Sequence, residues 1–196
     1  MVINNFWKKL KEYNKIANIA EIGRRYFAMN SFDGILTILG VLIGSYMAKV
    51  QDPHIIISTG FGVSIAMGIS GMWGTYLTEE AERSKKMKDL ARQTLRDMGK
   101  TKIAKAEKAA TLIVSFIDGM SPFLAAFIVI LPFFFTNLIG MTTAYFSSTA
   151  IAFVLLAGLG GFLGYISKDS ILAYALKMVF AGIVCIGLIF LLGVKV

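Results

Sequence analysis

The chain has 196 residues, of which 56% are hydrophobic, and its mean hydropathy is +0.69. This composition excludes an ordinary soluble domain and indicates a single membrane domain. The net charge of +8 would suit nucleic-acid binding, but most of the basic residues gather in two segments that flank apolar runs, so we expect no nucleic-acid partner. The single cysteine, Cys185, excludes a disulfide framework.

Residues 1–29 predict an amphipathic helix that lies on the membrane surface. The apolar positions recur at helical spacing and lysines stand between them, which is typical of interfacial helices. These apolar positions are Phe6, Leu10, Tyr13, Ile16 and Ala17.

Five apolar runs are long enough to cross a bilayer, which takes about 20 residues of helix. They cover approximately residues 30–50, 54–77, 111–136, 144–166 and 171–194. Residues 30–77 therefore hold the first two membrane helices and residues 111–196 hold the other three. Between them, residues 78–110 are charged and lack proline, and we expect a helical extension with a break near Gly99. The predicted fold class is an all-α membrane protein with five transmembrane helices.

The distribution of Lys and Arg predicts the orientation. Six basic residues precede the first span and ten follow the second, from Arg83 to Lys108, whereas the loop between the third and fourth spans has none. Basic loops stay in the cytoplasm. We therefore expect a cytoplasmic N-terminus, a C-terminus outside, and basic loops in the cytoplasm.

Two pairs of similar segments predict a parallel internal repeat that relates spans one and two to spans three and four. "SFDGILT" (31–37) and "SFIDGMSP" (115–122) both set Asp-Gly near the start of an odd-numbered span. "GISGMWG" (68–74) and "GLGGFLG" (158–164) both carry glycines at every third position, late in an even-numbered span. Internal repeats are common in transporters. For the glycines alone, close helix packing is the alternative explanation.

Each of the first two spans has a face of small and polar residues. On the first span the face consists of Asp33, Thr37, Gly40 and Gly44. On the second span it consists of Ser64, Gly68, Gly71, Thr75, Glu79 and Glu82. Two such stripes could line a narrow path that ends in carboxylates on the cytoplasmic side.

The residue types on these faces suit a metal ion and a proton. Carboxylate oxygens bind divalent cations, and the nearby thioether of Met72 favours a transition metal over Mg²⁺ or Ca²⁺. Carboxylates in membranes also carry protons. The alternatives stay open: a solvated ion-pair cluster of the glutamates with neighbouring basic residues, and for Asp118 a helix cap or a pair with lysine. The glutamates in question are Glu79, Glu80 and Glu82.

On the strength of these residues, the chain resembles the vacuolar iron transporter family. The match rests on "FDGILTILGVLIG", "GMWGTYLTEEAER", "DGMSPFLAAFIVILPF" and the glycine-rich fourth span. The resemblance implies a homodimer that moves Fe²⁺, and often Mn²⁺, out of the cytosol against protons, through a pore between the subunits. It also implies that Asp33 is the pore aspartate and that Met72, or alternatively Met67, is the methionine of the second span.

The chain departs from plant members of that family in its cytoplasmic extension. Plant members carry a glutamate-rich metal-binding domain there, whereas this extension is rich in lysine after Glu82. The chain thus resembles a short prokaryotic-type member, which implies a location in a prokaryotic cell membrane with the basic loops cytoplasmic. Its only further acids are Asp89, Asp97 and Glu107. We therefore expect no multi-metal store, and Glu79, Glu80 and Glu82 remain as an entry site.

Two functions follow from these observations. The first is export of Fe²⁺, Mn²⁺ or Co²⁺ by proton antiport through a pore at a dimer interface, with Asp33, Met72 and Asp118 on the path. The second is a non-transporting membrane protein whose basic cytoplasmic helices bind anionic lipid or a partner. The chain has no P-loop, HExxH, CxxC or nucleophile-elbow motif, so we expect neither an enzyme nor a permanently bound cofactor.

Overall fold

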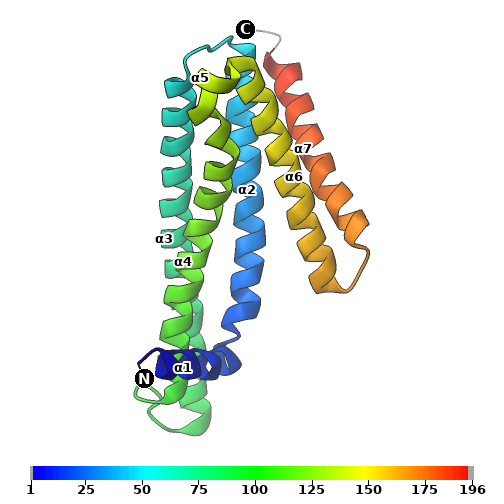
Figure 1. Cartoon of the computed structure of the whole chain (residues 1–196). Coiled ribbons are helices and arrows are strands. Elements are labelled where there is room, and N and C mark those ends of the chain that lie inside the picture. Colours follow the sequence, from blue (N-terminus) through cyan, green and yellow to red (C-terminus); the bar gives the residue numbers. More distant parts are fainter. Residues whose placement is uncertain (1, 194–196) are drawn as a thin grey trace. The chain divides into compact units, whose positions relative to one another are not determined.

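The computed structural model describes residues 2–193, with side chains from Trp7 onward, and Figure 1 shows the order of the elements. Within this range the chain is all-helical and contains no strand. The elements are α1 (Val2–Ala17), α2 (Ile19–Met47), α3 (Pro53–Thr94), α4 (Lys102–Ile130), the 3₁₀ helix η1 (Leu131–Phe135), α5 (Thr136–Ile139), α6 (Met141–Ser167) and α7 (Ile171–Gly193).

Five helices are long and apolar enough to cross a membrane, which confirms the predicted fold class. They are Ile19–Met47, Pro53–Thr94, the continuous segment Lys102–Ile139, Met141–Ser167 and Ile171–Gly193. Met1 and residues 194–196, which the predicted segments 1–29 and 111–196 include, lie outside the described residues.

The N-terminal segment contains a break between two helices that the helical spacing of its apolar residues does not predict. The first helix ends at Ala17, and α2 begins at Ile19, earlier than the predicted start of the first span at residue 30. Asn18 separates them with φ 51°, a left-handed conformation that Asn adopts more readily than most residues. The Asn14 side chain stabilises the turn, because its Oδ1 accepts a hydrogen bond from the Ala20 N–H at 2.6 Å. Residues 19–29 are therefore the first turns of the helix that continues into the predicted first span.

The chain divides into two compact units. The first unit combines the residues up to Phe27 with Ile69–Met120, and the second combines Ala28–Gly68 with the residues from Ser121 onward. The long helices α2, α3 and α4 each contribute residues to both units.

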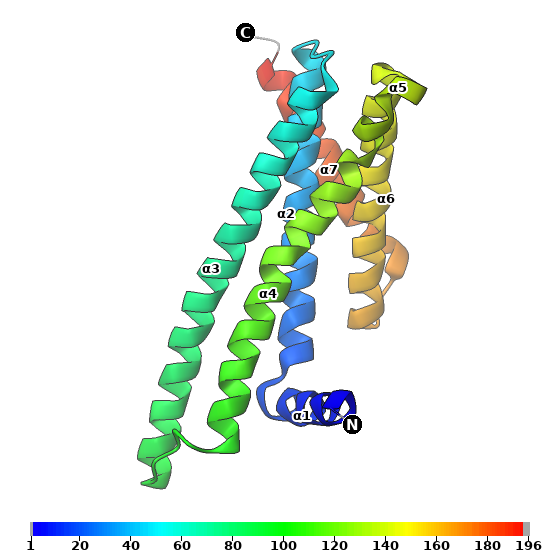
Figure 2. The same ribbon diagram turned by 60° about the vertical axis from the view of Figure 1, so that its left-hand side comes forward.

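In the first unit, the second half of α3 lies antiparallel to the first half of α4. Thr75 pairs with Asp118, whereas Arg83, further along α3, pairs with Glu107, earlier on α4. Helix α1 passes in front of the lower part of α4 in Figure 1 and lies beside it in Figure 2. Small residues permit this crossing, and the buried contacts are Ala17, Ile19, Ala106, Ala110 and Val114. The chain leaves helical structure between Thr94 and Lys102, around the predicted break at Gly99.

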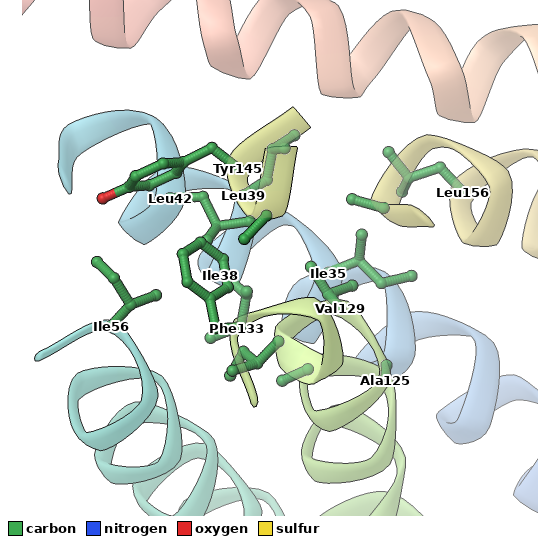
Figure 3. Packing of buried hydrophobic residues seen from close by; sticks show 14 of the residues in the cluster. Ile35, Ile38, Leu39, Leu42, Ile56, Ala125, Val129, Phe133, Tyr145 and Leu156 are labelled. Carbon is green, nitrogen blue, oxygen red and sulfur yellow. The ribbon is translucent and has the colours of Figure 1, made fainter. Parts of the chain in front are cut away.

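In the second unit, one face of α2 forms the centre of an apolar core (Figure 3). Ile35, Ile38, Leu39 and Leu42 are at most 1% exposed. They pack against side chains of α4, η1 and α6 that include Val129, Phe133 and Leu156. Because lipid tails are as apolar as these side chains, their contacts stabilise the helix bundle through close van der Waals packing and not through removal of apolar surface from water.

Two glycines of the second unit permit close contact between helix backbones. A Cβ on Gly34 would lie 2.6 Å from the carbonyl oxygen of Pro122, so α2 can touch α4 only because residue 34 has no side chain. A Cβ on Gly160 would lie 2.5 Å from the carbonyl oxygen of Tyr174, which likewise brings α7 against α6. Much of α7 is exposed, which suits a helix that faces lipid.

Candidate functional site

A row of buried polar residues lies between α3 and α4 in the first unit, and we call it the polar seam. Each member is at most 8% exposed. Its α3 members are Thr75, Glu79 and Arg83, which share one face because they are four residues apart. Its α4 members are Glu107, Thr111, Ser115 and Asp118. Buried polar groups are costly unless they form hydrogen bonds or ion pairs. The partners of each seam residue therefore determine whether that residue could also bind an ion.

Arg83 neutralises two buried carboxylates at one end of the seam. Its Nε donates to Glu79 Oε2 at 2.7 Å, and its Nη1 donates to Glu107 Oε2. Lys86 Nζ reaches Glu107 Oε1 at 2.6 Å, and the Tyr26 hydroxyl donates to Glu79 Oε1 at 3.3 Å. Two acids therefore face two cations, so this end of the seam is a charge-balanced network that ties α2, α3 and α4 together.

Asp118 lies at the other end of the seam, well inside α4. The Thr75 hydroxyl donates to its Oδ2 at 2.6 Å, and a Cβ on Gly71 would lie 3.1 Å from the same oxygen. Because α4 begins at Lys102, Asp118 does not cap this helix. The structure therefore brings together three predicted site residues, Gly71, Thr75 and Asp118.

We expect Thr75→Val to destabilise the protein by about 1–3 kcal/mol, because it leaves the buried Asp118 carboxylate without one of its donors. Thr78→Val is the matched control, since the Thr78 hydroxyl is exposed and donates only to backbone carbonyls of its own helix. Thermal unfolding of both purified variants in detergent checks the prediction. Equal melting temperatures for the two variants would contradict it.

Asp33 belongs to the second unit and is exposed, although it lies on a helix whose opposite face is buried in the core. Along the same stripe, Thr37 and Gly40 are half-buried and Gly44 is exposed. A Cβ on Gly44 would meet no atom within 4 Å. The face that begins with Asp33 is thus small, polar and incompletely covered by the chain's own side chains.

The glutamates of the predicted entry site have different surroundings. Glu79 is buried in the seam, whereas Glu80 and Glu82 are exposed. The Tyr76 hydroxyl lies 3.4 Å from Glu80 Oε1. Glu82 does not share the buried face with Glu79, because Arg83 occupies the next position of that face. An ion-pair interpretation therefore holds for Glu79, with the difference that the pair is buried rather than solvated.

The remaining predicted residues lie in ordinary helical surroundings. Met72 and Met67 are half-buried. Ser64 is 1% exposed, and its hydroxyl donates to the Gly60 carbonyl at 2.6 Å. Across residues 2–193, no three His, Cys, Asp or Glu side chains are grouped so that they could hold a metal ion. Predicted ligands are found in both units: Asp33 and the alternative methionine Met67 lie in the second, and the others lie in the first.

Sequence reasoning gave an ion-pair cluster with basic neighbours such as Arg83 and Lys86 as one alternative for Glu79, but it missed Glu107 and Tyr26 as members of this network. One signal was available, since Glu79 and Arg83 are spaced i, i+4 in the order that favours a helical ion pair. A second was the position of Glu107, which stands beside alanines within a lysine-rich segment. Neither signal predicts that Arg83 of α3 pairs with Glu107 of α4.

Comparison with known proteins places the chain in a family. The VIT family model matches residues 25–112, a range that includes Asp33, the α3 side of the seam and Glu107. An uncharacterized protein of Methanocaldococcus jannaschii is 34% identical over 163 residues, which cover 81% of this chain and 82% of that protein. Together with the five membrane-length helices, these matches show that the chain belongs to the VIT family.

Proposed function

We propose that this protein exports a divalent transition-metal ion, Fe²⁺ foremost and Mn²⁺ or Co²⁺ as alternatives, from the cytoplasm of a prokaryotic cell in exchange for protons. The ion would pass through a pore at the interface of a homodimer. Membership of the VIT family supports the coarser statement, transport of a metal ion across a membrane. Family membership does not by itself give the identity of the metal, the exchange for protons or the dimer, and these are the parts that we propose.

The exposure of Asp33 carries the proposal. A carboxylate on a membrane helix is costly when it faces lipid, so such residues face a partner or a water-filled path. Asp33 is exposed, yet its neighbours Gly34 and Ile35 are buried in the protein. A second copy of the chain, related by two-fold symmetry, would bring two Asp33 carboxylates together. Two carboxylates provide the oxygen ligands and the charge that a divalent cation requires.

The other predicted residues take roles that suit their surroundings. Glu80 and Glu82 are exposed and would collect the ion, whereas Glu79 already pairs with Arg83 and would hold the helices in place. Thr37, Gly40 and Gly44 would continue the path beyond Asp33. Two further groups would bind the metal ion on this path. They are the thioether of Met72 or Met67 and the buried carboxylate of Asp118.

Transport into proteoliposomes tests the proposal. We expect the purified protein to take up Fe²⁺ faster when an imposed gradient drives protons out of the vesicles, with proton efflux that accompanies the metal influx. Mn²⁺ and Co²⁺ uptake under the same gradient ranks the substrates. Uptake that ignores the gradient would overturn antiport in favour of a channel, and failure with all three ions would overturn the proposal.

A further inference from the structure

A groove of about 590 Å³ lies in the first unit, where α1 passes the first turns of α2 and the beginning of α4. Its walls are mainly apolar and include Leu10, Ile19, Phe27, Ile113 and Ile117. The volume lies in the range of sites that hold a small molecule. The groove therefore has room for a flexible apolar ligand.

A glycine at the floor of the groove lets α4 pack closely against α2. Gly23 of α2 lines the groove, and a Cβ there would lie only 2.9 Å from Ile117 Cδ1, so Ile117 already occupies the space beside residue 23. Ala20, one turn earlier, is small and exposed. The small side chain of Ala20 thus leaves the groove beside it unfilled.

The polar residues that line the groove make its rim positive. They are Lys11, Asn14 and Arg24, and the lining contains no acidic residue. Asn14 is engaged by the Ala20 N–H, so it contributes to the turn between α1 and α2. Arg24 Nε donates to the Ala20 carbonyl at 3.2 Å, which holds the Arg24 side chain along α2 beside the groove. The rim therefore complements an anion.

The rim lies at the level expected for lipid headgroups. The apolar run of α2 begins near residue 30, so Arg24 precedes it by about 9 Å along the helix axis. The headgroup region of each leaflet is about 5–8 Å thick, so Arg24 lies at its outer edge, next to the water. Trp7, at one end of the groove, is 56% exposed, and tryptophan is the residue most typical of this interface.

We propose that this groove binds an anionic phospholipid, with an acyl chain along the apolar wall and the phosphate between Lys11 and Arg24. An apolar cavity with a cationic rim at headgroup level matches the two halves of such a molecule. A zwitterionic lipid fits less well, because it adds a positive group beside two cations. The site is independent of the transport path proposed above, so either proposal stands if the other fails.

Quenching of Trp7 by brominated lipids tests the proposal in the full-length protein. Trp73→Phe leaves Trp7 as the only tryptophan, and the protein is reconstituted in phosphatidylcholine that contains a small fraction of lipid with brominated acyl chains. We expect brominated phosphatidylglycerol to quench Trp7 at a mole fraction about 30-fold lower than brominated phosphatidylcholine does, which is the effect of two basic residues near the membrane surface.

Three variants distinguish lipid binding in the groove from attraction of anionic lipid by general surface charge. Lys11→Gln with Arg24→Gln should abolish the preference for the anionic lipid. Lys9→Gln with Lys15→Gln is the matched control, because these exposed lysines of α1 do not line the groove and their loss changes the net charge equally. Ala20→Phe should fill the groove and abolish quenching at low mole fraction, while the exposed position preserves the fold.

Each contrary result has a definite meaning. Equal quenching by the two lipids in the Trp73→Phe protein would overturn the proposal in favour of nonspecific contact with surrounding lipid. An equal loss of preference in the Lys9 and Lys15 control would overturn it in favour of diffuse surface charge. Unchanged quenching in Ala20→Phe, in a variant with the unaltered melting temperature, would show that the lipid lies outside the groove.

Discussion

Asp33→Asn is expected to abolish metal uptake into proteoliposomes while the protein stays folded. The variant keeps the size of the side chain but removes the negative charge and the group that accepts a proton. Interactions of a charged group contribute about 1.5–3 kcal/mol, so loss of one carboxylate from each protomer corresponds to a fall in metal affinity of about 100-fold or more. Fold stability should be unaffected, because Asp33 is exposed and the core positions of α2 remain intact.

Asp89→Asn serves as the control for this prediction. Asp89 is an exposed carboxylate on the charged part of α3, outside the polar stripe of α2, and its loss changes the charge equally. We expect normal uptake in Asp89→Asn, and the melting temperatures of both variants should match that of the unmodified protein. Normal uptake in Asp33→Asn would remove Asp33 from the mechanism.

Arg83→Met is expected to cause a larger loss of stability than Thr75→Val, about 3–5 kcal/mol. The change leaves the carboxylates of Glu79 and Glu107 in the buried seam without the cation that they share. Glu79 is only 6% exposed and Glu107 only 2%. Because methionine replaces much of the apolar volume of arginine, the loss of stability measures mainly the cost of the two carboxylates that remain without their cation. Thermal unfolding of the purified protein in detergent measures it.

Two further variants isolate the cause of this effect. Lys102→Met breaks the Lys102–Glu12 ion pair, whose members are 76% and 46% exposed, and we expect no measurable change because solvent screens exposed pairs. The triple variant Glu79→Gln, Arg83→Met, Glu107→Gln removes the charges together and should recover much of the stability. If the triple variant were as unstable as Arg83→Met, lost packing of the arginine side chain would explain the defect instead.

The helical class and the five spans could be predicted from the sequence, because a bilayer requires long apolar runs whose backbone groups bond within one helix. Local spacing also identified the α2 stripe that begins with Asp33 and the shared face of Thr75 and Glu79. Both predictions depend only on helix periodicity, which any straight helix obeys. The boundary at Asn18 was not predictable in this way, since helical spacing continues on both sides of it.

Tertiary structure decided the partners of these side chains. The two Asp-Gly elements look alike in the sequence, yet Asp33 is exposed and Asp118 is buried beside Thr75. For Glu79 the sequence left both an entry site and an ion pair open, and the pairing was decided by α4, which places Glu107 beside Arg83, a residue 24 positions earlier in the chain. Periodicity assigns a residue to a face of its own helix, whereas the group that a buried carboxylate meets depends on which helix packs against that face and in what register.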